Sequence, residues 1–425
     1  MHFFTYKNGE LYCEDVPLKE IAEAFGTPVY VYSAKTLKRH YSIFDSAFKG
    51  IPHIVCYSLK ANSNLAVLTL LKTLGSGADV VSGGELKKAL KAGIPPDRIV
   101  FSGVGKTEEE LRLAVRKRIL LINVESEGEL RKLKEVSEGL RTKVNVSIRV
   151  NPNIDPKTHP YITTGLRKNK FGIPIAQAER LYSMINGHRY LCPVGISSHI
   201  GSQILEVSPF IQALKSIMEL GERLKRRGLA IKYLDIGGGL GITYKDELPA
   251  HPKEYGSKIC ELIWGTDYTL ILEPGRVIVG NSGVLLTKIL YVKKMGRKTF
   301  YIVDAGMNDL IRPALYNAYH QILPVKKGNE KKIRVDVVGP ICESGDFFAR
   351  DRLIPNQKEG DLLSVMSAGA YGFSMSSNYN MRKRVAEVLV SGTNFYLVRK
   401  RETMEDLIKN EVIPEIVKEG KIWEV

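Results

Sequence analysis

Short apolar runs rich in β-branched residues alternate with segments of helical periodicity over more than half of the chain. Such runs are typical of buried strands, and strands that alternate with helices form parallel sheets. The runs cover residues 54–60, 77–82, 98–103, 120–125, 144–150, 194–201, 233–239 and 270–276. Eight such units in about 220 residues predict a closed, TIM-like (β/α)8 barrel, with an open doubly wound sheet as the alternative.

The segments between these runs have the spacing of amphipathic helices. They cover residues 64–75, 84–93, 108–118, 128–136, 175–187, 210–228 and 253–265. Several have a glycine directly after the last apolar residue, where helices commonly end. A predicted helix therefore joins each predicted strand to the next, as a parallel sheet requires.

The pattern changes after residue 276. Residues 283–306 predict two strands around a basic turn, and further strand-like runs follow at 331–340, 361–372 and 385–400. Few helices separate these runs, which favours a mainly antiparallel β-domain.

The N-terminal segment 2–16 has the pattern of a hairpin that turns at Asn8-Gly9, and we expect it to join the C-terminal sheet. We therefore predict a barrel over residues 28–276 and a β-domain over residues 277–425, joined by the N-terminal segment 1–27. The tail 405–425 is expected to form a helix that packs on this β-domain.

The charge balance narrows the class of partner. Lys and Arg number 62 and Asp and Glu number 46, which gives a net charge of +16 and suits nucleic acid or small anionic ligands. The basic residues are spread along the chain without a nucleic-acid-binding motif, so we expect a solvated surface and no nucleic-acid partner. No apolar run has the length of a membrane span, and no membrane partner is expected.

The cysteines indicate the compartment. Five of them, Cys13, Cys56, Cys192, Cys260 and Cys342, are widely spaced, and no CxxC pair or His–Cys cluster indicates a metal site. The first residues also lack the pattern of a signal peptide. We expect a cytoplasmic protein without a bound metal.

Chemically active side chains stand where two of the predicted strands end, at the edge where barrel enzymes hold their catalytic residues. Lys60 ends the first strand, within YSLKANSN. A lysine with a lowered pKa attacks carbonyl groups, whereas a lysine that reaches solvent at the rim has no such role. His199 ends the sixth strand, within SSHIGSQ, where it is either structural or faces a ring.

Two glycine-containing motifs follow the seventh and eighth strands. DIGGGLG (235–241) lets backbone N–H groups approach an anion, where barrels commonly bind phosphate, and EPGR (273–276) offers Glu273 and Arg276 as charged partners. Either motif alone could be an ordinary turn. Together, a lysine, a histidine, a glycine-rich loop and a carboxylate at one barrel mouth match the needs of pyridoxal 5'-phosphate (PLP).

These motifs, with CESGDFFARDR (342–352) and GAYGFSMSSNYN (369–380), resemble those of the diaminopimelate decarboxylases, PLP enzymes of the alanine racemase-like, fold-III group. They occur in the family's order, and Ser58 is a small departure where alanine is common. The resemblance implies a PLP-binding barrel with an alanine racemase-like β-domain and a homodimer with shared active sites. It also implies the conversion of meso-2,6-diaminopimelate to L-lysine and CO2, the last step of lysine biosynthesis.

The resemblance also implies roles for single residues. Lys60 would bind the cofactor aldehyde, His199 would stack against the pyridine ring, and Glu273 would pair with the ring nitrogen. At or near the cofactor phosphate would lie Ser202, Gly237, Gly238, Gly239, Pro274, Gly275 and Arg276. Around substrate and cofactor would lie Arg276, Arg312, Tyr316, Glu343 and Tyr371, with Cys342 and Glu343 coming from the partner subunit.

The chemistry of the residues leaves some choices open. Arg312 can bind a distal carboxylate, and Glu343 can bind a distal ammonium. The proton that replaces CO2 could come from Cys342 or from Lys60.

Three alternative functions suit the residues less well. A decarboxylase for ornithine, arginine or a carboxylated polyamine is less favoured, because the ornithine type usually has Asp where Glu343 stands. An alanine racemase would need a second base and does not suit CESGD or EPGR. A non-catalytic PLP carrier would lack the predicted β-domain.

Overall fold

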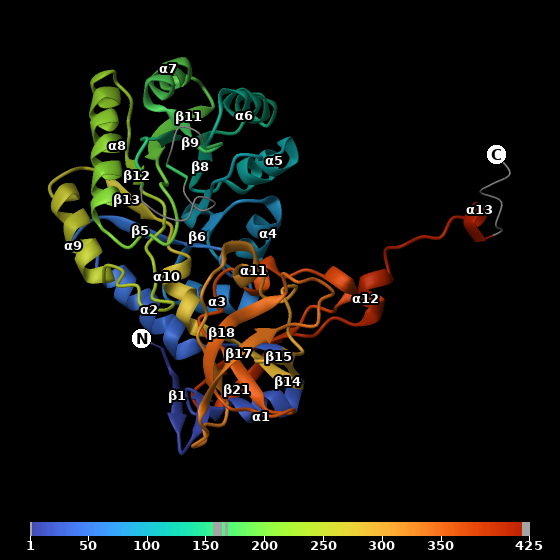
Figure 1. Ribbon diagram of the computed structural model, residues 1–425. Coiled ribbons are helices and arrows are strands. Elements are labelled where there is room, and N and C mark those ends of the chain that lie inside the picture. Colours follow the sequence, from blue (N-terminus) through green and yellow to red (C-terminus); the bar gives the residue numbers. More distant parts are fainter. Residues whose placement is uncertain (1, 156–163, 166–168, 419–425) are drawn as a thin grey trace.

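The computed structural model describes residues 2–155, 164–165 and 169–418, and its first large unit is a closed parallel barrel (Figure 1). The barrel strands are β5 (His53–Ser58), β6 (Gly77–Val80), β7 (Ile99–Phe101), β8 (Leu121–Val124), β9 (Val144–Asn151), β11 (Leu191–Ser197), β12 (Tyr233–Asp235) and β13 (Thr269–Leu272). They pair in the order β9-β11-β12-β13-β5-β6-β7-β8, and a β9–β8 pairing closes the ring. The closed barrel is therefore confirmed, and the open doubly wound sheet is wrong.

Helices surround the barrel on its outside (Figure 1). They are α3 (Leu65–Thr73), α4 (Gly83–Lys91), α5 (Glu108–Lys117), α6 (Glu127–Gly139), α7 (Ile175–Ile185), α8 (Ser208–Arg226), α9 (Pro252–Ile263) and the short α10 (Arg276–Val279). Because α10 has only 4 residues, α2 (Ala34–Ser46), which precedes β5, packs between α9 and α3 and covers the remaining barrel surface. None of the described helices is long and apolar enough to cross a membrane.

Hydroxyl residues cap several of these helices within a few residues of the preceding strand. The side chains of Ser82, Thr107 and Ser126 accept a hydrogen bond from a backbone N–H in the first turn of α4, α5 and α6. Thr107 and Glu110 form a reciprocal capping box. These caps keep the connections short and leave the carboxyl ends of the strands at one mouth.

A second, mainly antiparallel sheet follows the barrel, as predicted. Its strands are β4 (Val29–Ser33), β14 (Gly283–Met295), β15 (Lys298–Val303), β16 (Ile322–Pro324), β17 (Lys332–Val338), β18 (Phe347–Pro355), β19 (Leu362–Val365), β20 (Ala386–Ser391) and β21 (Asn394–Arg399). The main path runs β18-β17-β15-β14-β4-β20-β21, and β19 pairs with β14 and β16. The pairs β15–β17 and β4–β20 are parallel.

The N-terminal part differs from expectation in two respects. Residues 29–33, which the prediction placed in the barrel segment, form β4 in the middle of the second sheet, between β14 and β20. The hairpin of β1 (Phe4–Lys7) and β2 (Glu10–Cys13) forms its own three-stranded sheet with β3 (Val16–Pro17).

This small sheet is held against the larger one by side-chain packing more than by strand pairing. Phe4, Leu11 and Val16 share one apolar cluster with residues of β4, β14 and β20. Within the described residues, one isolated β-bridge joins the small sheet to the segment that follows β16, and it pairs Glu10 with Lys326. The division at residue 276 stays a prediction.

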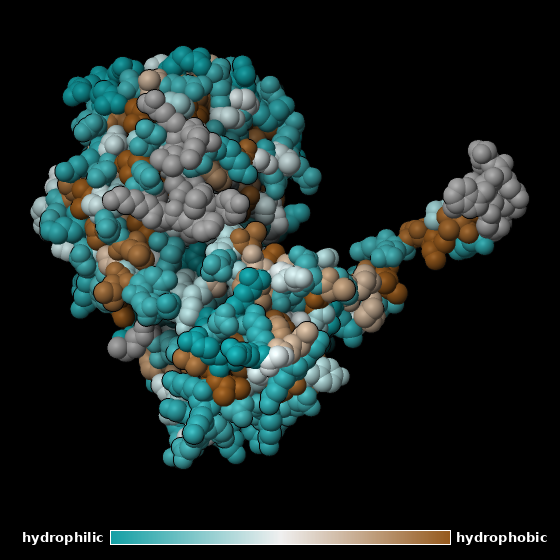
Figure 2. Space-filling model, in the orientation of Figure 1, coloured by the Kyte–Doolittle hydropathy of each residue, from teal (hydrophilic) through white to brown (hydrophobic). Residues whose placement is uncertain are grey.

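The C-terminal tail leads away from the body (Figure 1). It contains α12 (Met404–Ile408) and α13 (Glu415–Lys418), and its apolar side chains Val412 and Ile413 are exposed. Figure 2 shows apolar residues, in brown, along this tail. The expectation that the tail packs on the β-domain of its own chain is wrong for the described residues.

Candidate active site

Lys60 and Asp79 form a close ion pair at the carboxyl ends of β5 and β6. Nζ of Lys60 lies 2.6 Å from Oδ2 of Asp79, whose side chain is fully buried, whereas the Lys60 side chain is 33% exposed. Desolvation opposes the charge of Lys60, but the carboxylates of Asp79 and Glu273 outweigh it and raise the lysine pKa above its usual value. The amine is therefore held at the barrel mouth as an ammonium by a buried acid.

Two further buried carboxyl groups, Glu273 and Asp235, lie beside this pair. Oε1 of Glu273 accepts a hydrogen bond from Ser102 Oγ at 3.1 Å, and Oδ2 of Asp235 accepts from Asn123 Nδ2 at 2.7 Å. Burial, together with the charges of Asp235 and Asp79, raises the pKa of Glu273 well above its usual value. In the described residues, no group of three or more His, Cys, Asp or Glu could hold a metal ion.

His199 follows β11 and faces the same mouth as a neutral imidazole. Its Nδ1 accepts a hydrogen bond from the N–H of Gly238 at 3.3 Å. Burial and the positive charges of Arg149 and Lys60 hold its pKa well below the usual value. The ring is therefore an uncharged face next to the lysine.

The glycine tract after β12 passes so close to its neighbours that side chains would not fit. A Cβ on Gly237, whose φ is +66°, would lie 2.5 Å from Nδ1 of His199. A Cβ on Gly238 would lie 2.0 Å from the carbonyl oxygen of Glu273. The loop is thus clamped between β11 and β13, and Gly239 continues it with its carbonyl accepting from Ile204 N at 2.9 Å.

Pro274, Gly275 and Arg276 form the turn from β13 into α10. The carbonyl of Pro274 accepts from Ser58 N at 3.0 Å, and Gly275 precedes the first residue of α10. The buried guanidinium of Arg276 donates to the hydroxyls of Tyr244 at 2.6 Å and Ser202 at 3.1 Å. Its Nε is buried and has no hydrogen-bond partner among the described residues.

Arg312 comes to the same place from α11 (Arg312–Tyr316) of the β-domain. Its guanidinium carbon lies 4.9 Å from the Tyr244 ring centre and 6.0 Å from the Tyr316 ring centre, and its Nε donates to His320 Nε2 at 3.4 Å. Burial and the charge of Arg312 lower the pKa of His320 to about 3. His320 is therefore a neutral acceptor at physiological pH.

Neither buried arginine forms an ion pair with a carboxylate in the part of the chain that is described. Two guanidinium groups, Arg276 and Arg312, thus face one site with only neutral partners. A buried cation is expensive unless an anion pairs with it. The arrangement is suited to two anionic groups supplied by ligands.

Tyr371 links the second sheet to the lysine. Its backbone N–H donates to the carbonyl of Ala61 at 2.8 Å, next to Lys60. Its ring centre lies 4.9 Å from the guanidinium carbon of Arg276. The aromatic ring therefore packs between the two parts of the chain at the mouth.

Cys342 and Glu343 are the two predicted site residues that the structure does not bring to this mouth. Both are exposed, and the backbone N–H of Cys342 donates to Asn380 Oδ1 at 3.0 Å. Glu343 is hydrogen-bonded to Tyr379, whose pKa it raises. No contact between either residue and Lys60 exists among the described residues.

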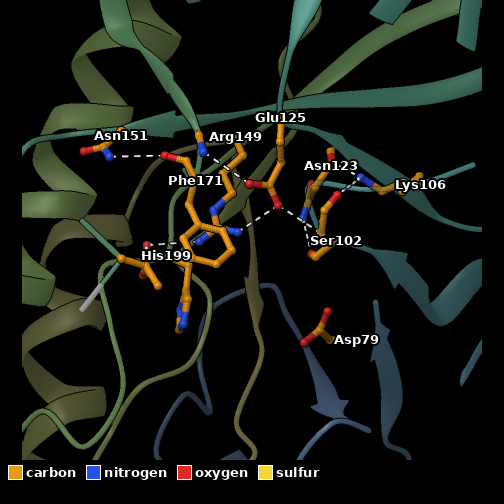
Figure 3. A network of polar contacts seen from close by, with 12 residues as sticks. Asp79, Ser102, Lys106, Asn123, Glu125, Arg149, Asn151, Phe171 and His199 are labelled. Atoms are coloured by element: carbon orange, nitrogen blue, oxygen red, sulfur yellow. Dashed lines mark hydrogen bonds and ion pairs between the residues drawn. The ribbon is translucent and has the colours of Figure 1, made fainter. Parts of the chain in front are cut away.

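A second layer of polar residues behind the site was not predicted from the sequence (Figure 3). Arg149 Nη1 lies 2.8 Å from Glu125 Oε1, and both side chains are buried. Arg149 also donates to the carbonyl of His199 at 3.4 Å, and its guanidinium carbon lies 4.9 Å from the Phe171 ring centre. This pair positions the segment that carries His199.

A signal for these residues was present in the sequence. Asp79, Asn123, Arg149 and Asp235 each interrupt an apolar strand run with a polar side chain. In a barrel such a residue points into the core and needs partners there. No comparable pattern marked Tyr244 or His320, which lie outside the barrel strands.

Comparisons with known proteins agree with this geometry. Residues 34–280 match the family model described as "Pyridoxal-dependent decarboxylase, pyridoxal binding domain". The chain is 52% identical over 409 residues to the diaminopimelate decarboxylase of Aquifex aeolicus, covering 96% of this chain and 97% of that protein.

Solved structures extend the similarity to the whole fold. The diaminopimelate decarboxylase from Helicobacter pylori complexed with L-lysine has a TM-score of 0.89 at 43% identity and covers 95% of this chain and 100% of that one. The enzyme from M. jannaschii in co-complex with L-lysine has a TM-score of 0.92 at 42% identity, with 97% and 98% covered. Given these matches over nearly its full length, the chain belongs to the diaminopimelate decarboxylase family of pyridoxal-dependent decarboxylases.

Proposed function

We propose that this chain converts meso-2,6-diaminopimelate to L-lysine and CO2 with PLP as cofactor, the last step of lysine biosynthesis. The main supporting observation, beside family membership, is that Arg276 and Arg312 are both buried at the Lys60 mouth without an acidic partner among the described residues. One can bind the cofactor phosphate, and the other can bind a carboxylate of a substrate that has two. A substrate with a single carboxylate would lose that group as CO2 and leave Arg312 unpaired.

The residues at the mouth fit PLP. Arg276 has a buried Nε without a partner in the described chain and lies beside Ser202 and the glycine tract, a donor set suited to a phosphate. Lys60 offers an amine, and Glu273 offers a carboxyl group for a ring nitrogen. When bound, PLP supplies an aldehyde that bonds to amino groups and a ring that accepts the electron pair left by CO2.

The protein's own residues control protons and charge at that ring. Asp79 stabilises the protonated form of Lys60, and its carboxylate can accept that proton when the free amine is needed as a nucleophile. Glu273, whose carboxyl favours a proton because burial and the charges of Asp235 and Asp79 raise its pKa, stabilises positive charge at the ring nitrogen when it ionises. His199 adds an uncharged face, so it does not compete with that charge.

Arg312, Tyr316 and Tyr371 provide the walls for the substrate on the β-domain side. The Arg312 guanidinium can bind the distal carboxylate with two hydrogen bonds, and the hydrogen bond from its Nε to His320 orients it. The hydroxyls of the two tyrosines can accept from an ammonium group. Recognition of the distal centre thus comes from the β-domain, whereas the reacting amine comes from the barrel.

We also propose a homodimer in which Cys342 and Glu343 complete the partner's site. Their exposure, and the absence of any described contact with Lys60 of the same chain, support this arrangement. Cys342 or Lys60 would then deliver the proton that replaces CO2. A cytoplasmic location is proposed as well, since all five cysteines are free.

Mixing of two inactive variants tests the shared site. Lys60→Ala and Cys342→Ser should each be nearly inactive alone. Mixed in equal amounts and allowed to exchange subunits, they should recover about one quarter of wild-type activity, because half of the dimers are mixed and each then has one intact site. No recovery despite demonstrated exchange would show that the site lies within one chain.

CO2 release on a substrate panel tests the activity itself. The PLP-loaded protein is assayed with meso-, LL- and DD-diaminopimelate, ornithine, arginine and lysine. Release from the meso isomer alone is expected. Release from ornithine or arginine instead would contradict the roles of Arg312 and Tyr316.

A further inference from the structure

A small polar cavity of about 180 Å³ lies where the loop after Lys60 meets β20 and β21 of the second sheet. Lys88 of α4 lines it from the barrel side, and Ser374, Ser376, Arg384 and Arg399 line it from the C-terminal side. None of the residues assigned above to the cofactor or substrate lines this cavity. Its volume is below the roughly 300–1,000 Å³ of pockets for larger ligands.

The cavity wall carries more positive than negative charge. Lys88, Arg384 and Arg399 are cationic, and Glu387 is the one carboxylate among the described lining residues. Burial and the charge of Arg399 lower the pKa of Lys88, so the cations at this wall repel one another. An anion inside the cavity would relieve that repulsion.

Glu387 does not neutralise this charge. Its oxygens already accept from Tyr32 OH at 2.7 Å and from Asn64 Nδ2 at 3.0 Å, and Arg399 Nε is 3.9 Å from Oε2. Burial also raises the pKa of Glu387. The hydrogen bonds of the Glu387 carboxylate are therefore made mainly to neutral groups, and the three cations keep an excess of positive charge.

One lining residue of this cavity has an unused donor. Arg384 Nε is buried and has no hydrogen-bond partner within the described part of the chain. The hydroxyls of Ser374 and Ser376 already donate to the carbonyls of Ala61 and Phe373, so the donors for an anion are the three cationic side chains of the wall. Buried polar groups without partners are rare in native proteins, and a bound ion can supply the missing partner.

We propose that this cavity is a binding site for a small oxyanion of the phosphate type, separate from the catalytic mouth. Lys88 and Arg399 supply charge, and Arg384 supplies a directed donor. The wall is bonded to the loop after Lys60, because Ser374 Oγ and Tyr371 N both donate to the carbonyl of Ala61, at 3.2 Å and 2.8 Å. A bound anion therefore fastens the β-domain to the barrel next to the catalytic lysine.

Inorganic phosphate binding to the PLP-loaded holoenzyme tests this site, because the cofactor then fills the phosphate position at the mouth. Labelled phosphate is measured by equilibrium dialysis at constant ionic strength, with chloride as the balancing anion. Saturable binding near one phosphate per chain is expected. Arg384→Gln and Lys88→Gln should each weaken it at least about tenfold, since each removes a charged donor.

Two further variants make the result decisive. Lys87→Gln, on the exposed side of α4, is the matched control and should bind phosphate like the wild type. Ser376→Asp places a carboxylate at the wall and should abolish phosphate binding while the PLP absorption stays as in the wild type, which keeps the test valid if Arg384→Gln does not fold. Absence of saturable binding, or equal binding in all four variants, would overturn the proposal.

Discussion

Nζ of Lys60 lies 2.6 Å from Oδ2 of Asp79, and the same oxygen accepts a hydrogen bond from Ser58 Oγ at 2.6 Å. The buried carboxylate therefore has its charge directed at the catalytic amine. Asp79→Asn should lower the pKa of Lys60, because it removes the main charge that raises it. We expect PLP to bond to Lys60 of the cofactor-free variant faster at neutral pH, with the pH profile of that rate moved to lower pH.

The control for this variant is Asp97→Asn, an exposed residue that precedes the next strand. It should leave both the rate and the pH profile as in the wild type. If Asp79→Asn changed neither, Asp79 would have only a structural role.

Glu273→Gln should lower turnover much more than cofactor binding. The amide cannot become negative, so it cannot stabilise positive charge at the ring nitrogen, although it keeps the size of the side chain. We expect kcat to fall by at least about 100-fold, with PLP content unchanged in the absorption spectrum. Glu254→Gln on the exposed face of α9 serves as control, and sustained turnover in Glu273→Gln would remove that role.

Gly237→Ala should weaken PLP binding and lower the thermal midpoint. The added Cβ would meet Nδ1 of His199 at 2.5 Å in a backbone conformation of positive φ. Gly187→Ala is a matched control, because Gly187 also has a positive φ, of +74°, but nothing lies within 4 Å of its Cβ among the described residues. Both variants carry the backbone strain of about 1–2 kcal/mol, so the difference between them reports the clash.

Arg312→Lys should raise the KM for meso-diaminopimelate about tenfold while it changes kcat little. A lysine keeps the charge but loses the planar fork that can bind a carboxylate with two hydrogen bonds. Arg334→Lys on the exposed surface of β17 is the control. A fall in kcat with unchanged KM would place Arg312 at the reacting centre instead.

His320 should make the protein less stable as the pH falls. Its folded-state pKa of about 3 lies below the ordinary value of 6.5, so the unfolded chain binds the extra proton over this range. The free energy of unfolding should therefore decrease from about pH 6.5 downward, by at most about 1.4 kcal/mol per pH unit from this residue. His320→Gln should flatten the decline in thermal midpoint between pH 6.5 and 5, and an unchanged slope would contradict the buried neutral state.

The barrel was predictable because its signal is local and repeated. Each strand is a short apolar run that a helix follows in the sequence. Eight such units in succession predict parallel strands that close into a ring. Lys60, His199, the glycine tract and Glu273 were predictable for the same reason, since strand ends of a barrel meet at one mouth. The place of β4 was not, because an apolar strand such as 29–33 has the same pattern in either sheet.

The features that the sequence did not predict depend on contacts between residues that are distant in sequence. Tyr244 and His320 lie in irregular segments, and only the folded chain places them against Arg276 and Arg312. The small N-terminal sheet stayed separate because Pro17 and the short strands leave few N–H groups free to extend the pairing. Packing of Phe4 and Leu11 replaces that pairing, and a pattern of alternation does not specify it.

The position of β4 also determines how the chain can be cut or synthesised. Because Val29–Ser33 sits between β14 and β20, a fragment beginning at residue 277 lacks the central strand of its own sheet. On the ribosome, β4 emerges long before its neighbours and must wait unpaired while the whole barrel is made. A protease nick in the connection between β4 and the barrel would leave both pieces associated, whereas expression of either half alone would yield an incomplete sheet with open edges.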